Sequence, residues 1–220
     1  MHPFHTVIFD LDGTLLNTLL DLTDSVNYAL SLHNLPVRTV EEVRTFVGNG
    51  VGQLVHRAVP DGTSEALESS CLADFRAHYL LNMEHKTAPY PGILDLLDAL
   101  GNAGLSLAVV SNKFDGAVKG LCQTYFGTRI PVAASIGESQ GVLRKPAPDT
   151  VFRALSELGV SPNGAVYVGD SDVDIQTAHN AGLPCISVSW GFRSRAFLAA
   201  HGASTIVDTP AALHKLLLGE

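Results

Sequence analysis

Residues 5–15 read H-T-V-I-F-D-L-D-G-T-L, and the rest of the chain is organised around this stretch. Residues 7–9 form a continuous apolar run, which predicts a strand that is buried on both faces of a parallel sheet. Asp10 and Asp12 follow it, and residues two apart in an extended backbone point to the same side. Like charges this close repel each other, so the pair predicts a bound cation, a shared proton or a catalytic role. The alternative is an ordinary Asp-Gly turn, in which Gly13 permits a backbone conformation that a side chain would disfavour.

The composition predicts a folded globular protein with no affinity for polyanions. The 220 residues are 46% hydrophobic and 16% charged, which argues against a disordered chain and allows a core domain with a modest insert. The net charge of −8 argues against binding to nucleic acid or to an anionic membrane surface. We expect a small-molecule partner, and either a monomer or a homodimer.

The cysteines and the first residues indicate the compartment. Cys71, Cys122 and Cys185 are far apart and odd in number, so they form neither a C-x-x-C pair nor a disulfide framework. The chain has no basic segment followed by a long apolar one at its start, and no apolar run approaches the ~20 residues that span a bilayer. We therefore expect a cytoplasmic protein.

Helical periodicity dominates the segment after the first strand. Apolar residues recur at helical spacing over residues 19–30, 40–47, 51–59 and 64–81, and little in this segment is typical of a strand. The sequence therefore predicts a small all-helical cap at residues 16–86, inserted after the first strand. The core domain would consist of residues 1–15 and 87–220.

Strands and helices alternate in the second half. Apolar strands are predicted at residues 105–110, 132–136, 165–168 and 184–188, with helices at 93–100, 115–125, 147–158 and 173–181. Residues 195–200, 205–207 and 211–218 complete the alternation. Repeated strand–helix units predict an α/β fold with a Rossmann-like parallel sheet wrapped by helices on both faces. Ligands of such sheets bind beyond the carboxyl ends of the strands.

Polar side chains lie at three of these strand ends. Ser111 and Asn112 follow the strand at 105–110, where they are candidates either for a helix cap or for a phosphate cradle. Lys145 is the first residue of K-P-A-P, whose prolines would restrict the backbone conformation and so fix the direction of the lysine side chain. Asp170 and Asp174 follow the strand at 165–168. A hard cation such as Mg²⁺ needs only one or two carboxylates, which Asp170 and Asp10 could supply, whereas Asp174 is also a candidate for a helix cap.

Other cofactor motifs are excluded by their spacing. The D-S-D-V-D run lacks the glycine and the final glutamate of a calcium-binding EF-hand loop. G-N-G-V-G at residues 48–52 follows a helix and has the wrong spacing for a dinucleotide site, and no P-loop motif occurs. The nine histidines show no zinc-ligand spacing.

The order of these motifs identifies a family. D-x-D-G-T, S-N, K-P-x-P and G-D-S-x-x-D, each at a predicted strand end, together resemble the four motifs of the haloacid dehalogenase superfamily. The helical insert is similar to the cap of its first subclass. F-V-G-N-G in the insert, S-N-K, and V-G-D-S with A-x-x-A-G most resemble its phosphoglycolate phosphatases. Asn17 departs from the pattern, since relatives often carry Asp there.

The resemblance implies a phosphomonoester hydrolase that depends on Mg²⁺ and acts through an aspartyl-phosphate, on 2-phosphoglycolate or a similar small metabolite. Asp10 would be the nucleophile, Asp12 the general acid and base, and Lys145 would stabilise the transferring phosphoryl group. The metal ligands would be Asp10, Asp170 and the backbone carbonyl of Asp12, with Asp174 as an orienting partner. Ser111 and Asn112 would bind the phosphoryl group.

Three alternatives remain on the same fold. A haloacid dehalogenase would need no acid at Asp12, whereas a phosphosugar mutase of the β-phosphoglucomutase kind would keep both aspartates. A non-enzymatic scaffold could have lost the carboxylates that this chain retains.

Substrate choice is expected to depend on the helical insert. Gly48, Asn49 and Gly50 are the candidates, because glycines let backbone N–H groups approach a ligand, although a simple helix break explains them equally well. Arg44 and Arg57 lie near them in the sequence and could hold a carboxylate.

Overall fold

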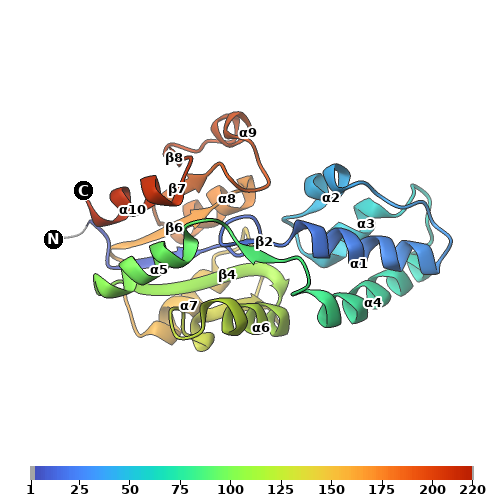
Figure 1. Ribbon diagram of the computed structural model, residues 1–220, viewed down its shortest axis with the longest axis horizontal. Coiled ribbons are helices and arrows are strands. Elements are labelled where there is room, and N and C mark those ends of the chain that lie inside the picture. Colours follow the sequence, from blue (N-terminus) through green and yellow to red (C-terminus); the bar gives the residue numbers. More distant parts are fainter. Residues whose placement is uncertain (1–2, 220) are drawn as a thin grey trace.

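The protein is built on a six-stranded parallel sheet, seen in a computed structural model that describes residues 3–219 (Figure 1). The strands occur in the order β5-β4-β1-β6-β7-β8, with β1 between β4 and β6. Their bounds are β1 Thr6–Phe9, β4 Ser106–Phe114, β5 Ser135–Glu138, β6 Ala165–Gly169, β7 Cys185–Val188 and β8 Ile206–Val207. Every residue of β1 is buried, as its uninterrupted apolar run requires. The predicted α/β fold with a Rossmann-like parallel sheet is confirmed.

Helices cover both faces of this sheet. Alternate side chains of β1 point to opposite faces, so Val7 and Phe9 pack in one apolar cluster with α5, α6 and α10, and Ile8 packs in another with α7 and α8. The bounds of the sheet-covering helices are α5 Ile93–Asn102, α6 Asp115–Phe126, α7 Asp149–Leu158, α8 Asp172–Ala181, α9 Arg195–Ala200 and α10 Pro210–Leu218. Within the described residues, no helix is both long enough and apolar enough to cross a membrane.

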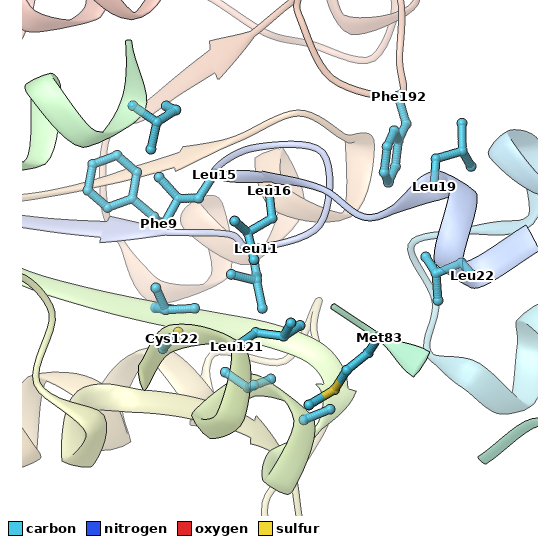
Figure 2. Close-up of a cluster of buried hydrophobic side chains, with 14 of the residues drawn as sticks. Phe9, Leu11, Leu15, Leu16, Leu19, Leu22, Met83, Leu121, Cys122 and Phe192 are labelled. Carbon is cyan, nitrogen blue, oxygen red and sulfur yellow. The ribbon is translucent and has the colours of Figure 1, made fainter. Parts of the chain in front are cut away.

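A separate group of helices lies beyond one end of the sheet (Figure 1). This helical group consists of α1 Leu19–Leu32, α2 Val40–Phe46, α3 Val51–Ala58 and α4 Glu65–Asn82. Thr39 begins α2 with a capping box to Glu42, and Ser64 caps α4, so polar side chains fix where these helices start. Buried side chains continue without a break from the sheet into the group, through Leu16, Leu19 and Leu22 (Figure 2).

Two short strands join the helical group to the sheet. β2 (Leu16–Asn17) pairs antiparallel with β3 (Ala88–Pro89), so the chain leaves and re-enters the sheet region side by side. Periodicity did not predict them, because two residues are too few to show a pattern. The buried Asp21 carboxylate strengthens this junction by accepting the backbone N–H groups of Lys86 at 3.0 Å and Thr87 at 2.8 Å.

Two predicted boundaries are wrong. The strand expected at 105–110 continues to Phe114, because β4 pairs with β5 again at Phe114–Glu138 after a bulge. Ser111 and Asn112 therefore lie within a strand and cap no helix; α6 begins after Phe114 without a side-chain cap. The strand expected at 132–136 is a 3₁₀ turn over Val132–Ala134, followed by β5.

The junction yields a stability prediction. Asp21→Ala should lower the free energy of unfolding by about 1–3 kcal/mol, because it leaves the N–H groups of Lys86 and Thr87 without their acceptor. Asp24→Ala is the matched control, since it removes an exposed ion pair to Lys86 and should cost less than about 1 kcal/mol. Urea denaturation of both variants measures the difference. Equal losses would show that Asp21 does not secure the junction.

Candidate active site

The predicted site residues converge where parallel strands end beside the helical group. Asp10 follows β1, Ser111 and Asn112 lie in the last part of β4, and Asp170 follows β6, so these neighbouring strands deliver their polar residues to one edge. A small cavity of about 50 Å³ opens there. Most of the predicted site residues line it, namely Asp10, Asp12, Gly48, Gly50, Ser111, Asn112, Lys145 and Asp170. Asn49 and Asp174 do not.

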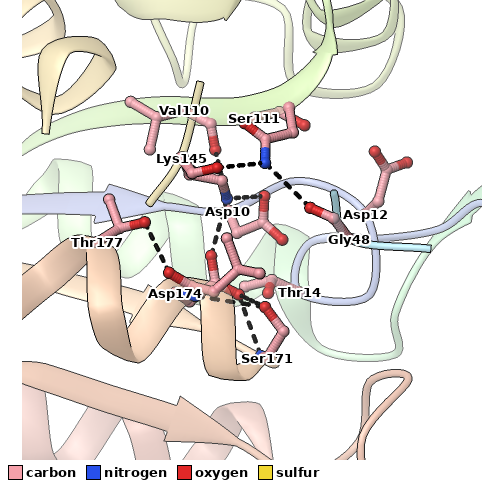
Figure 3. A network of polar contacts seen from close by, with 12 residues as sticks. Asp10, Asp12, Thr14, Gly48, Val110, Ser111, Lys145, Ser171, Asp174 and Thr177 are labelled. Atoms are coloured by element: carbon pink, nitrogen blue, oxygen red, sulfur yellow. Dashed lines mark hydrogen bonds and ion pairs between the residues drawn. The ribbon is translucent and has the colours of Figure 1, made fainter. Parts of the chain in front are cut away.

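Lys145 is held between two carboxylates (Figure 3). Its Nζ lies 2.8 Å from Asp10 Oδ1 and 2.8 Å from Asp174 Oδ1, and it also donates to Tyr167 Oη at 3.0 Å. Burial alone would lower the pKa of this lysine, but Asp10 and Asp174 outweigh burial and raise the pKa above its usual value. Lys145 therefore remains a cation inside the protein. Its side chain is fixed where it can face an anionic group next to Asp10.

Asp10 is a buried carboxylate with one oxygen available. Burial raises its pKa well above the usual value, Asp174 and Asp170 add to this, and Lys145 opposes it. Oδ1 is occupied by Lys145, whereas Oδ2 has no hydrogen-bond partner among residues 3–219. A carboxylate with one oxygen anchored and the other directed into a cavity has the geometry of a nucleophile or a metal ligand.

The buried Asp170 carboxylate accepts hydrogen bonds from one backbone N–H and one hydroxyl. The N–H of Phe192 donates to its Oδ2 at 2.6 Å, and Thr14 Oγ1 lies 3.3 Å from its Oδ1. Burial and Asp174 raise the pKa of Asp170 to about 7, against the opposing effect of the Phe192 N–H and of Arg193. Gly13 has a φ of +90°, and a side chain there would collide with the Asp170 carboxylate.

These carboxylates can accommodate a cation. Asp10, Asp170 and Asp174 each offer an oxygen, and these oxygens lie within 4.8 Å of one another. Lys145 supplies one positive charge against three buried carboxylates, and Asp174 adds to the effect of burial in raising the pKa values of Asp10 and Asp170. Oxygen donors suit a hard divalent cation. Both oxygens of Asp174 already accept hydrogen bonds, Oδ1 from Lys145 and Tyr167 and Oδ2 from Ser171. Asp174 is therefore better suited to orienting Lys145 than to binding the cation.

Asp12 occupies a different environment from Asp10. Its Oδ1 accepts a hydrogen bond of 2.6 Å from Thr18 Oγ1 and pairs with Lys113 Nζ at 3.0 Å. The same Nζ donates to Tyr79 Oη of α4 at 2.8 Å. The two aspartates of the first motif thus form ion pairs with two different lysines, Asp10 with Lys145 and Asp12 with Lys113. Sequence reasoning quoted Lys113 but gave it no role, although a lysine within a buried strand requires an anionic partner.

Comparisons with known proteins agree with this arrangement. The family model of haloacid dehalogenase-like hydrolases matches residues 7–188. The chain belongs to this family. It is 37% identical over 214 residues to a phosphoglycolate phosphatase of Rhodospirillum rubrum, covering 94% of this chain and 88% of that protein. It is 33% identical over 217 residues to a phosphoglycolate phosphatase of Agrobacterium fabrum, covering 96% and 93%.

A solved structure gives the same result for the fold. A proposed phosphoglycolate phosphatase from Lactobacillus delbrueckii subsp. bulgaricus superimposes with a TM-score of 0.93 at 38% identity, over 100% of both chains. The resemblance predicted from the four motifs is therefore confirmed, and this haloacid dehalogenase-like hydrolase is a phosphatase.

Two core side chains of the hydrolase contact the helical group across the cavity. Asn112 Nδ2 donates to the carbonyl of Gly48 and to that of Lys145, each at 3.0 Å. Arg193 donates to the carbonyls of Arg44 at 2.7 Å and Val47 at 2.8 Å, at the end of α2. Arg193 was not found from the sequence, because nothing in its local pattern distinguishes it from a solvated arginine.

The remaining predicted residues serve the loop itself. The side chain of Asn49 accepts from Arg57 Nη2 at 2.9 Å, and Arg57 Nη1 donates to the carbonyl of Phe46. Arg44 pairs with Glu41 at 3.2 Å. Neither arginine lines the cavity, and the expectation that they hold a substrate carboxylate stays a prediction. Arg57 thus fixes the turn that carries Gly48 and Gly50, whereas Arg44 pairs within α2.

Proposed function

We propose that the protein is a Mg²⁺-dependent phosphomonoester hydrolase that forms an aspartyl-phosphate on Asp10. The observation that carries this is the separation of two carboxylates on one cavity, Asp10 beside Lys145 and Asp12 beside Lys113. Different environments for paired carboxylates permit different roles, one as a nucleophile and one as an acid and base.

The reaction would proceed in two displacements at phosphorus. Asp10 Oδ2 attacks, a bond from this oxygen to phosphorus forms, and the bond to the leaving alkoxide breaks while Asp12 donates it a proton. A water molecule then attacks the phosphorus of the aspartyl-phosphate while Asp12 takes its proton. The bond from phosphorus to Asp10 Oδ2 breaks, so the Asp10 carboxylate is regenerated and inorganic phosphate leaves. Lys145 and the Ser111 hydroxyl face the phosphoryl oxygens, whose charge they would stabilise.

Asp10, Asp170 and the backbone carbonyl of Asp12 would hold the Mg²⁺. Bound there, the ion would neutralise charge between the nucleophile and the phosphoryl oxygens. Asp174 would keep Lys145 in place, as its 2.8 Å contact supports.

We infer that residues 16–86 act as a cap domain over a core formed by residues 1–15 and 87–220. The contacts of Asn112 and Arg193 with the loop at 44–48 would close this cap above the cavity. The cap side of the cavity is lined by Leu22, Val47, Val51 and Leu54 together with Gly48 and Gly50, so a bound substrate meets apolar side chains and backbone.

The substrate proposed is 2-phosphoglycolate, in line with the names of the relatives. Gly50 begins α3 without a side-chain cap, so the first N–H groups of this helix are free to bind the carboxylate of a small substrate. Phe192 is the one aromatic side chain among the described residues that line the cavity, so a nucleotide base would find little to stack on and a small ester is favoured.

The nucleophile is tested by two isosteric variants. Asp10→Asn should lower kcat by at least about 10⁴-fold, the scale seen when a nucleophile is removed. Asp12→Asn should lower kcat by about 10²–10⁴-fold and allow phosphoenzyme to accumulate, because the carboxylate that activates water is lost. Release of phosphate measures kcat for both variants, and acid-quenched labelling with a radioactive phosphate ester measures the amount of phosphoenzyme. Substantial turnover by Asp10→Asn would contradict the covalent mechanism.

The metal is tested by removal and by one ligand. Excess chelator should abolish activity. Asp170→Asn should raise the Mg²⁺ concentration needed for half-maximal activity by about 100-fold, since mutating even a residue that only orients a metal ligand lowers metal affinity by about 10–100-fold. The Mg²⁺-dependent rise in Tm should weaken in parallel. Asp172→Asn, a neighbouring carboxylate outside the cluster, is the control and should change neither. Full activity in chelator would refute the proposal.

The substrate is tested with a panel of phosphomonoesters that includes sugar phosphates and nucleotides, with free phosphate and sugar isomers as products. We expect 2-phosphoglycolate among the best substrates, measured by kcat/KM. Gly50→Ala should lower kcat/KM for it on the order of 10-fold more than for p-nitrophenyl phosphate, because Gly50 has a φ of +85° and an added Cβ would lie 3.3 Å from the Asn112 carbonyl oxygen.

Gly52→Ala is the matched control for this test, since an added Cβ there meets nothing within 4 Å and the residue needs no unusual φ. A preference for a sugar phosphate or nucleotide would overturn the substrate assignment. Isomerisation of a sugar phosphate without phosphate release would indicate a mutase instead.

A further inference from the structure

We propose that Lys113, supported by Tyr79, is a positioning residue that fixes Asp12 through Oδ1 and so presents its catalytic proton from Oδ2. The inference rests on the acid–base role proposed for Asp12. It assigns a function to a buried lysine that binding of the phosphoryl group does not use.

The hydrogen-bond donor and the cation that contact Asp12 both face the same oxygen. Lys113 Nζ lies 3.0 Å from Oδ1, and Thr18 Oγ1 lies 2.6 Å from it. Among residues 3–219, Oδ2 has no hydrogen-bond partner, and the Asp12 side chain lines the cavity with 12% of its surface exposed. A proton on Oδ1 would face two donors, so the protonated acid carries its hydrogen on Oδ2.

Lys113 is built to keep this position. Its side chain is 2% exposed, and its Nζ is shared between Asp12 and Tyr79 Oη at 2.8 Å. Burial alone would lower the pKa of Lys113, but Asp12 and Tyr79 raise it above its usual value, so the lysine remains a cation. A lysine whose charge and direction are both fixed restrains the carboxylate better than a water molecule would.

The support comes from the helical group. Tyr79 is fully buried in α4, with its ring stacked on Phe75 at a centroid distance of 5.6 Å and edge-on to Phe114 of β4 at 6.3 Å. Lys113 and Phe114 thus belong to the core strand, whereas Tyr79 and Phe75 belong to the helical group. Lys113 therefore connects Asp12 to α4, and the packing of Tyr79 against β4 fixes the lysine that pairs with the acid.

Two esters with different leaving groups separate positioning of the acid from loss of structure. An alkoxide such as that of 2-phosphoglycolate needs a proton as it leaves, whereas p-nitrophenolate does not. The ratio of kcat/KM reports the steps up to formation of the phosphoenzyme, where only the alkyl ester depends on the acid. Where the panel selects another alkyl ester, that ester takes the place of 2-phosphoglycolate.

Lys113→Met should lower kcat/KM for 2-phosphoglycolate by about 100-fold, the lower range for loss of an acid, and for p-nitrophenyl phosphate by less than about 10-fold. Lys113→Arg should restore part of the loss, because it keeps a cation. Tyr79→Phe should change the ratio in the same direction by a smaller factor, and it keeps the ring packing if Lys113→Met does not fold. Lys119→Met and Tyr125→Phe are controls that remove a lysine and a tyrosine hydroxyl elsewhere, and should leave the ratio unchanged.

The inference would be overturned if Lys113→Met and Tyr79→Phe lowered kcat/KM equally on both esters while Asp12→Asn still lowered it more for 2-phosphoglycolate than for p-nitrophenyl phosphate. That result would leave the proposed function standing. An Asp12→Asn variant that loses the same factor on both esters would overturn the acid–base role itself. The two failures are therefore distinguishable.

Discussion

The structure depends on one buried cation, Lys145, placed between Asp10 and Asp174. Each contact is 2.8 Å long, and Lys145 and Asp174 are almost fully buried. Removing one partner of such a pair leaves an uncompensated charge and typically costs about 3–5 kcal/mol. The surrounding elements keep the three groups together: β1 delivers Asp10, the capping box of α8 fixes Asp174 through Ser171, and Tyr167 of β6 bonds both Lys145 and Asp174. The sheet order places β6 beside β1 so that these groups meet.

The carboxylates are unequal because their surroundings are unequal. Asp10 has lost solvent and lies near Asp170 and Asp174, which together raise its pKa and leave the cluster short of positive charge. Asp12, two residues later, lies outside that cluster and has its own lysine and a hydroxyl donor. Two carboxylates only two residues apart thus have different surroundings, one within a cluster of carboxylates and one beside its own cation. This difference is what the proposed division into a nucleophile and an acid requires.

Local pattern was sufficient for most of the fold and for part of the site. The uninterrupted apolar run of β1, the helical spacing of α1–α4 and the later alternation fix the element order, and the parallel sheet then brings Asp10 and Asp170 together. The polar residues Ser111 to Lys113 were read as the end of a strand, because polarity normally marks a loop; here they are the part of β4 that faces the cavity. Lys113 binds Tyr79 across 34 residues, and Arg193 binds Arg44 across 149. Contacts of that range leave no trace in local periodicity.

Two of the contacts between the helical group and the residues around the cavity lead on to an acidic side chain. Tyr79 holds Lys113, which holds Asp12; Arg193 holds the end of α2 and follows Phe192, whose N–H binds Asp170. Arg193 also lowers the pKa of Asp170, against burial, so its charge favours the ionised form that a metal requires. Under the proposed function, a small phosphate ester offers few contacts beyond its phosphoryl group, and the residues of the helical group that line the cavity would supply the others. Tyr79 and Arg193 thus connect the packing of the helical group to Asp12 and Asp170 at once, so a change in how this group packs against the sheet would alter the surroundings of both carboxylates.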